Sequence, residues 1–126
     1  MARILIIEDQ KIFREMLRET LELEGYEIIE ASNGSEGVRL YRKDPTDLII
    51  TDMVMPEKEG FEIIDELKRD YPEIKIIAIS GVGWVEPNSY LRLAEKLGAA
   101  RTFAKPFDRD EMLDAVKELL NEKESA

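Results

Sequence analysis

The chain has 126 residues, no cysteine, no histidine and a formal net charge of −10. Its length fits one domain with its own core, and it can form no disulfide, serine–histidine triad, histidine-ligated zinc site or phosphohistidine. A net acidic chain is unsuited to nucleic-acid phosphates, no apolar run is long enough to span a membrane, and any chemistry has to use carboxylates, hydroxyls and lysines.

The first predicted strand, Arg3–Ile7, is apolar and ends at two acids, Glu8 and Asp9. A helix is predicted over Lys11–Glu24, because apolar residues recur there at helical spacing and Gly25 follows as a helix stop. These apolar residues are Ile12, Phe13, Met16, Leu17 and Leu21.

The second strand, Tyr26–Ala31, alternates polar and apolar residues, which is typical of a strand at the edge of a sheet. Asn33 with Glu36 three residues later resembles a capping box. It predicts a helix to about Lys43, ended by Asp44-Pro45.

The third strand, Asp47–Asp52, is a continuous apolar run that ends in a carboxylate, with Met55-Pro56 just behind it. Such a run is typical of a parallel strand buried on both faces. Asp52 on its own fits a helix-capping or turn aspartate equally well. A helix is predicted over Glu59–Asp70, with its inward face at Ile63, Ile64 and Leu67.

The fourth strand, Ile74–Ile79, leads into Ser80-Gly81. A longer loop, Val82–Glu86, follows it. The next helix is predicted from Pro87 to Gly98, because proline favours the first position of a helix and glycine the position after its end.

The fifth strand, Arg101–Ala104, leads into Lys105-Pro106. Asp108 and Glu111 predict the capped start of a last helix, after which a short charged tail, Asn121–Ala126, remains. The buried stripe of this helix is predicted at Met112, Leu113, Val116 and Leu120.

This strict alternation predicts an α/β fold: a flavodoxin-like (βα)5 three-layer sandwich around a parallel sheet of order 2-1-3-4-5. The switch point of that order lies between the first and third strands, so Glu8, Asp9 and Asp52 are expected in one crevice. Ser80 and Lys105 would reach it from the fourth and fifth strands. Each residue alone fits a solvated loop, and only the convergence of all five indicates a site.

Clustered carboxylates repel one another, so their stable occupant is a hard cation such as Mg²⁺. If Asp52 attacks phosphorus, the transferring oxygens need positive charge and hydrogen-bond donors. Mg²⁺, Lys105 and the Ser80 hydroxyl would supply both. An acyl phosphate on Asp52 would result.

At these positions the chain closely resembles the receiver domains of two-component response regulators, over nearly its whole length. The residues that carry the resemblance are Glu8-Asp9, Asp52 to Pro56 with Gly60, Ser80-Gly81 and Lys105-Pro106-Phe107. The resemblance implies that Asp52 accepts a phosphoryl group from a histidine kinase or a phosphotransfer protein. It also implies a single receiver domain without an output domain, which docks to a downstream protein or relays the phosphoryl group.

The family's pattern also implies roles for the other residues. Asp9, Asp52 and the carbonyl of Val54 would hold Mg²⁺, and Glu8 would act mainly through bound water. Ser80 and Lys105 would contact the phosphoryl oxygens. Four further residues would support the loops of the site: Met55, Pro56, Gly81 and Pro106.

Two departures from the pattern concern the switch. Thr102 stands where the family usually carries a tyrosine or phenylalanine, and Phe103, one residue later, is expected in the core. The loop after Ser80 is longer than usual and holds the only tryptophan, Trp84. Thr102 and Trp84 are therefore the switch candidates.

Three other classes compete with this interpretation. A haloacid-dehalogenase-type phosphatase needs a second aspartate two residues after the nucleophile, where this chain has Val54. A flavodoxin needs a phosphate-binding loop after the first strand, where this chain has Glu8-Asp9-Gln10. A receiver fold kept as an interaction module is the remaining alternative.

We therefore expect a phosphoacceptor rather than a dedicated enzyme, one that takes its phosphoryl group also from small donors and loses it by its own hydrolysis. A cytoplasmic location is expected, since the chain enters a strand directly without a signal sequence. We expect a monomer or a weak dimer, with no contact to nucleic acid or membrane.

Overall fold

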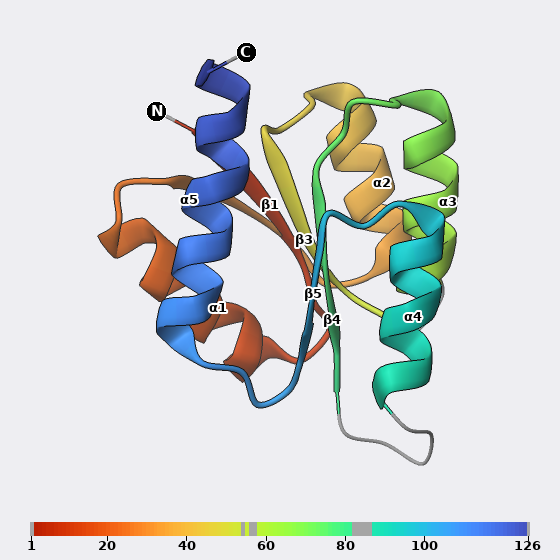
Figure 1. Ribbon diagram of the computed structural model, residues 1–126, viewed down its shortest axis with the longest axis horizontal. Coiled ribbons are helices and arrows are strands. Elements are labelled where there is room, and N and C mark those ends of the chain that lie inside the picture. Colours follow the sequence, from red (N-terminus) through yellow and green to blue (C-terminus); the bar gives the residue numbers. More distant parts are fainter. Residues whose placement is uncertain (1, 54, 56–57, 82–86, 126) are drawn as a thin grey trace.

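The computed structural model describes residues 2–53, 55, 58–81 and 87–125, and its centre is a parallel sheet of five strands (Figure 1). The strands pair in the order β2-β1-β3-β4-β5, as the sequence predicts. Their bounds are β1 (Arg3–Ile7), β2 (Glu27–Ala31), β3 (Leu48–Asp52), β4 (Ile76–Ser80) and β5 (Arg101–Ala104). Because all five run in one direction, their carboxyl ends share one edge of the sheet.

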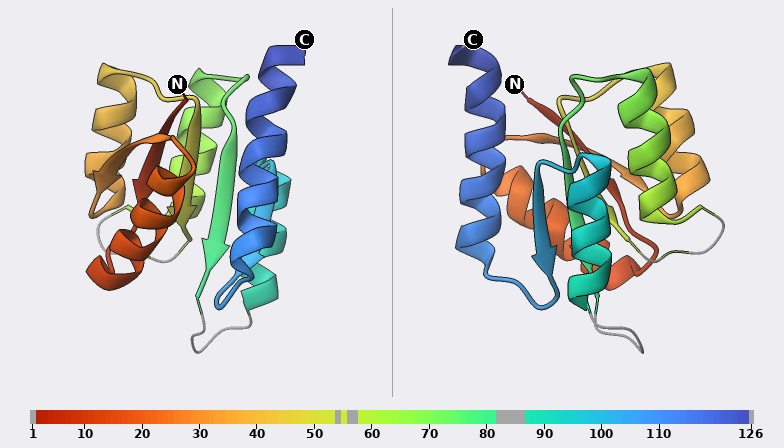
Figure 2. Two further views of the ribbon diagram at one scale, coloured as in Figure 1. Left: turned by 90° about the vertical axis from the view of Figure 1, so that its left-hand side faces the viewer. Right: turned by 45° about the vertical axis from the view of Figure 1, so that its right-hand side comes forward.

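Helices cover both faces of the sheet and complete the predicted three layers (Figure 2). One face carries α1 (Lys11–Leu23) and α5 (Arg109–Ser125). The other carries α2 (Gly34–Lys43), α3 (Gly60–Asp70) and α4 (Pro87–Leu97). Each helix follows its strand and packs back on the sheet, as crossover connections between parallel strands require.

The three central strands are buried on both faces because their successive side chains point to opposite helix layers. In β1, Ile4 and Ile6 pack with the core under α1 and α5, whereas Leu5 and Ile7 pack with the core under the other three helices. The edge strand β2 is only partly buried, as its alternating sequence predicts.

The helix ends follow the capping signals. Asn33 Oδ1 accepts a hydrogen bond of 2.8 Å from the N–H of Glu36, and Asp108 Oδ1 caps α5 in the same way. Gly25 and Gly98, which follow α1 and α4, have φ values of +93° and +112° that only glycine adopts easily.

The last helix is longer than the sequence predicts. The buried stripe at Met112, Leu113, Val116 and Leu120 is confirmed, but α5 continues beyond it to Ser125 instead of ending in a charged tail. Residues 121–125 contain neither glycine nor proline, the two residues that most disfavour a helix, so the helix continues past Leu120.

Two residues of the apolar stripe predicted in α1 are not buried. Leu17 and Leu21 lie in the core, but Ile12 is 85% exposed and Met16 is 49% exposed. Ile12 and Met16 lie about 100–180° around the helix from Leu17 and Leu21, since successive helix residues are about 100° apart. Leu17 and Leu21 pack with the core under α1 and α5, so Ile12 and Met16 point away from that core.

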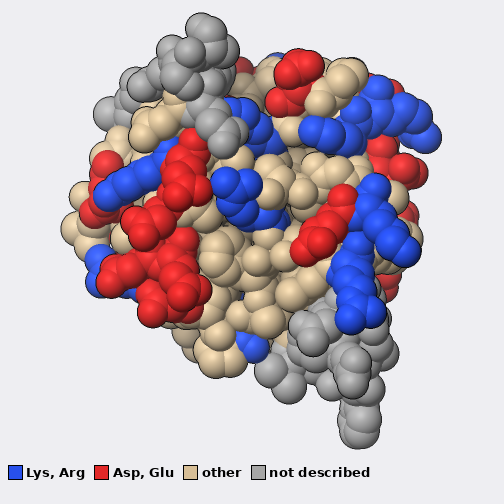
Figure 3. Space-filling view, in the orientation of Figure 1, with Lys and Arg blue, Asp and Glu red and all other residues tan. Residues whose placement is uncertain are grey.

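The surface is charged throughout, and its acidic excess is visible along α5 (Figure 3). Up to residue 121, where side chains are described, the exposed acids of this helix are Asp110, Glu111, Asp114 and Glu118. No helix in the described part of the chain is both long enough and apolar enough to cross a membrane.

Candidate functional site

The predicted acids meet at the carboxyl edge of the sheet. Asp52 is the last residue of β3 and Glu8 directly follows β1; they are 6% and 2% exposed. Asp9 is exposed to solvent beside them. One carboxylate oxygen from each of the three residues lies within 4.8 Å of the others. The three acids predicted to converge after the first and third strands therefore lie together.

Lys105 reaches these acids from the end of β5. Its ammonium Nζ lies 2.6 Å from Glu8 Oε1 and 3.1 Å from Asp52 Oδ2. The Glu8 carboxylate also accepts a hydrogen bond of 3.1 Å from the N–H of Gln10. The acidic pair is thus bridged by a single cation that is itself largely buried.

Burial dominates the electrostatics of Glu8. Loss of water raises the pKa of its carboxyl to about 7, although the hydrogen bond from Lys105 opposes the shift, and the neighbouring charge of Asp52 adds to it. Burial also opposes the charge of Lys105, but the hydrogen bond to Glu8 and the charge of Asp52 outweigh it and raise the pKa of Lys105. Glu8 and Asp52 thus share the positive charge of Lys105.

The donor set fits a hard dication. Three carboxylates within reach of one point are oxygen ligands of the kind that Mg²⁺ prefers. The raised pKa of Glu8 indicates that added positive charge would be stabilised there. Asp9 is the most accessible of the three ligands, because it is exposed, whereas Glu8 and Asp52 are buried and both contact Lys105.

Ser80 ends β4 beside Asp52. Its hydroxyl is fully buried, and Ser80 Oγ has no hydrogen-bond partner among the described residues. A buried hydroxyl without a partner lowers stability, so its presence calls for a functional explanation. Its position at the end of β4, the strand next to β3, suits a hydrogen-bond donor to an oxygen that binds near Asp52.

The supporting residues are placed as follows. Met55 is buried and packs in the core under α2, α3 and α4. Gly81 lies beside Lys105, since a Cβ atom on it would come within 3.6 Å of Lys105 Cδ. Pro106 is exposed and joined to Lys105 by a cis peptide bond.

Among the switch candidates, Thr102 is half-buried on β5, and its hydroxyl lies 3.3 Å from Glu95 Oε1 of α4. Phe103 packs against the core under α1 and α5, as expected. Val54, Pro56 and Trp84 lie outside the described residues.

Two residues of the site were missed by sequence reasoning. Arg14 of α1 donates a hydrogen bond of 2.8 Å to the carbonyl of Glu8 and so fixes the turn that presents both acids. Phe13 lies under the ammonium of Lys105. The sequence predicts Phe13 only as part of the apolar stripe of its helix, and nothing in that pattern predicts a contact with a lysine far along the chain.

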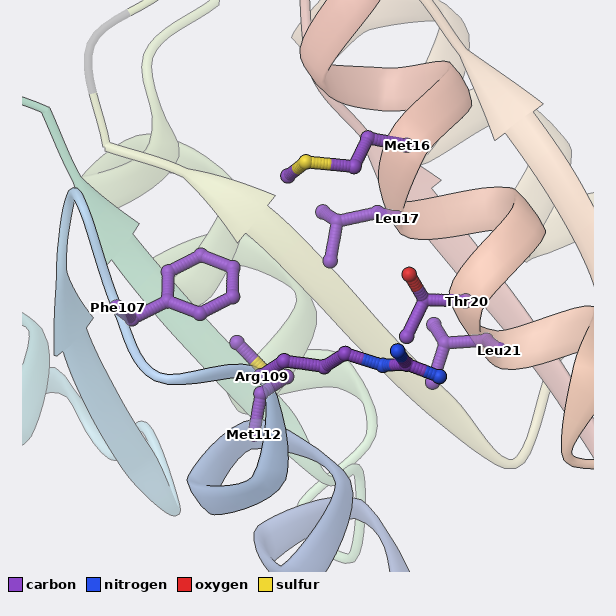
Figure 4. A pocket seen from close by; sticks show the side chains of 7 residues that line it. All are labelled: Met16, Leu17, Thr20, Leu21, Phe107, Arg109 and Met112. Carbon is purple, nitrogen blue, oxygen red and sulfur yellow. The ribbon is translucent and has the colours of Figure 1, made fainter.

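A groove of about 300 Å³ opens beside the site, between α1 and α5 (Figure 4). The side chain of Arg109 extends across it toward Thr20 and Leu21. The apolar walls of the groove are formed by Met16, Leu17, Leu21, Phe107 and Met112.

Comparison with known proteins agrees with this geometry. The family model described as response regulator receiver domain matches residues 4–117. The chain is 36% identical to sporulation initiation phosphotransferase F of Bacillus subtilis, with 94% of this chain and 93% of that protein covered. It is 34% identical to chemotaxis protein CheY of the same organism, with 94% and 98% covered.

The solved structure of a response regulator receiver domain protein from Clostridium thermocellum superimposes with a TM-score of 0.90 at 31% identity, covering 98% of each chain. A CheY-like receiver domain protein from Methanospirillum hungatei gives 0.88 at 28% identity, with 99% of this chain and 98% of that one covered. These structures confirm the flavodoxin-like fold class. The chain belongs to the response regulator receiver family of two-component signalling.

Proposed function

We propose that this chain is a phosphoacceptor in which Asp52 takes a phosphoryl group from a histidine kinase or a phosphotransfer protein. The observation that carries the proposal is the setting of the Asp52 carboxylate. It has the Lys105 ammonium 3.1 Å away, and Ser80, at the end of the neighbouring strand β4, has a buried hydroxyl with no partner among the described residues. One group would neutralise, and the other would hydrogen-bond, the oxygens of a phosphoryl group arriving at Asp52.

In the proposed step, a carboxylate oxygen of Asp52 attacks phosphorus. A new P–O bond forms while the P–N bond to the donor histidine breaks, and the leaving imidazole keeps the electron pair and takes up a proton. With a small acyl phosphate as donor, a P–O bond breaks and a carboxylate leaves. Lys105 moves from its carboxylate partners to a phosphoryl oxygen, and Ser80 donates its hydroxyl proton to another.

Mg²⁺ is the proposed cofactor. Asp9 and Asp52 would hold it, with Glu8 beside them and the carbonyl of Val54 as a further ligand. When bound, the cation offsets the negative charge that the carboxylates and the phosphoryl group bring together.

We propose that the phosphorylated chain acts by docking to a downstream protein or by relaying the phosphoryl group. The names of its relatives include both a phosphotransferase and a chemotaxis protein. The acidic exposed face of α5 suits a partner with a basic surface. Its phosphorylation by small donors and its loss of the group by hydrolysis are part of the same proposal.

Intact-mass spectrometry after incubation with acetyl phosphate and Mg²⁺ tests the proposal. A single phosphoryl adduct is expected on the wild type and none on Asp52→Asn, since the amide has no carboxylate to attack phosphorus. A wild type without adduct under any donor would instead favour an interaction module without phosphorylation.

A further inference from the structure

The ring of Phe13 lies beneath the lysine of the site, with Lys105 Nζ 4.1 Å from the ring centroid. Phe13 belongs to the first turn of α1, whereas Lys105 follows β5 at the other end of the chain. The face of an aromatic ring is its negative part and attracts a cation at this distance. We infer that Phe13 is a positioning residue that holds the Lys105 ammonium at the phosphoryl site.

The orientation of this ring is fixed by two other phenylalanines. Phe107 meets Phe13 edge to face, with the centroids 5.6 Å apart and the planes at 88°. Phe103 of β5 in turn packs against Phe107, with the centroids 5.8 Å apart. The segment that carries Lys105 therefore also supplies the rings that turn the face of Phe13 toward it.

The contact between Phe13 and the Lys105 ammonium differs from the contacts of Lys105 with Glu8 and Asp52, because only the contact with Phe13 can stay unchanged during phosphoryl transfer. The Glu8 and Asp52 carboxylates now bind Lys105, at 2.6 and 3.1 Å, but both belong to the acid group that would face the metal and the phosphoryl group. Phe13 would contact neither the metal nor the phosphoryl group. Its contact can persist while Lys105 exchanges a carboxylate oxygen for a phosphoryl oxygen, and it leaves the charge and the N–H donors of Lys105 free.

The inference rests on the proposed transfer to Asp52 and adds to it a residue that never touches the phosphoryl group. The alternative is that Phe13 is only a space-filling residue between α1 and the segment after β5. Whether Phe13 positions Lys105 or only fills space, removing its ring should cost some stability. The two roles differ in whether the rate of phosphorylation depends on the electrons of the ring.

The test compares initial rates of phosphorylation by subsaturating acetyl phosphate with Mg²⁺, measured by intact mass. Phe13→Leu removes the ring and should slow the reaction on the order of 2- to 30-fold, the range of cation–π energies. Phe13→Tyr keeps a ring and should stay within about 2-fold of the wild type by the same reasoning. The matched control is Phe61→Leu, because Phe61 is also a half-buried residue in the first turn of a helix but packs on the opposite face of the sheet.

A second series separates the electrons of the ring from its shape. Site-specific replacement of Phe13 by monofluoro-, difluoro- and trifluorophenylalanine weakens the attraction for a cation stepwise while the ring stays nearly the same size. The rate should fall in that order. In the proton NMR spectrum, the ring-current shift of the Lys105 side-chain protons should be present in wild type and lost in Phe13→Leu.

A flat fluorine series, or a Phe13→Leu rate equal to that of Phe61→Leu, overturns the inference while transfer to Asp52 stands. A wild type that forms no adduct overturns the proposed function, and the inference with it. Normal phosphorylation of the wild type with a graded loss across the fluorine series supports both.

Discussion

A Cβ atom on Gly60 would lie 2.3 Å from the carbonyl oxygen of Asp52 and 2.6 Å from the Cα atom of Met53. The N–H of Gly60 also donates a hydrogen bond of 3.1 Å to the carbonyl of Met53. The first turn of α3 is therefore pressed directly against the backbone at the end of β3, and only a residue without a side chain fits there.

Gly60→Ala should therefore destabilise the protein by about 1–3 kcal/mol or more, because the methyl group forces backbone apart at a fully packed point. Urea denaturation measures the change. The matched control is Gly81→Ala, whose Cβ would meet only Lys105 Cδ at 3.6 Å, an ordinary contact. Equal stability of the two variants would contradict the close approach at Asp52.

The buried carboxyl of Glu8 should make stability depend on pH. Its pKa is raised from 4.5 to about 7 in the folded chain, so between these values the folded state binds more protons than the unfolded state. The contribution of this group to the free energy of unfolding is fully present below pH 4.5 and is lost as the pH rises through 7. The loss is on the order of 3 kcal/mol.

Urea denaturation in EDTA, at a series of pH values from about 4.5 to 8, compares wild type with Glu8→Gln. The amide keeps an oxygen for Lys105 but does not titrate, so the variant should gain stability relative to wild type as the pH rises. Parallel curves for the two proteins would show that Glu8 ionises normally.

Mg²⁺ should raise the melting temperature without any phosphoryl donor, because a ligand that binds only the folded state stabilises it, by about 2.7 kcal/mol at 100 times its dissociation constant. Asp9→Asn should weaken this effect more than Glu8→Gln, since the Glu8 carboxylate is already held by Lys105 and Gln10. Asp65→Asn, which changes an exposed acid on α3, serves as the control. A melting curve unaffected by millimolar Mg²⁺ would count against the site.

Ser80→Ala should have opposite effects on the resting and the phosphorylated protein. Ser80 Oγ is buried and makes no hydrogen bond within the described residues, so its removal should leave the resting stability unchanged or raise it by up to about 1 kcal/mol. The same change removes a donor to the phosphoryl oxygen. Binding of beryllofluoride, which stands in for the phosphoryl group, should therefore weaken.

The emission of Trp84, the only tryptophan, reports on the same change. With Mg²⁺ and beryllofluoride the emission should shift in wild type and shift much less in Ser80→Ala, if the loop after Ser80 follows the hydroxyl. An emission unmoved by saturating beryllofluoride would remove Trp84 as a switch candidate and leave the surface around Thr102.

Strand ends were predictable from the sequence because parallel strands bring their carboxyl ends to one edge whatever the details of packing. Asp52, Ser80 and Lys105 could therefore be placed together from strand order alone. Strands predicted from apolar runs agree with β1, β3 and β4 to within two residues at each end. The caps at Asn33 and Asp108 were equally readable, since each depends on neighbours in the chain.

Contacts between separate elements were not predictable. The apolar residues of α1 cover a wide arc of the helix, so their spacing alone does not decide that Ile12 is exposed and Leu17 buried; the position of the sheet and of α5 decides it. The contact of Phe13 with Lys105 likewise depends on where the first turn of α1 meets the segment after β5. The end of α5 was also hard to predict, because no glycine or proline follows Leu120 to mark where the helix stops.

The two outer strands have a consequence for how molecules meet one another. β2 exposes unpaired backbone groups on one side, yet Glu27 and Glu30 line it and form ion pairs with arginines, including Arg18 at 2.8 Å from Glu30. On β5, Arg101 pairs with Glu118. Charges on edge strands hinder the addition of a strand from a second molecule. A second molecule that paired with either edge would have to bury these ion pairs, so the charges keep the sheet from growing beyond its five strands.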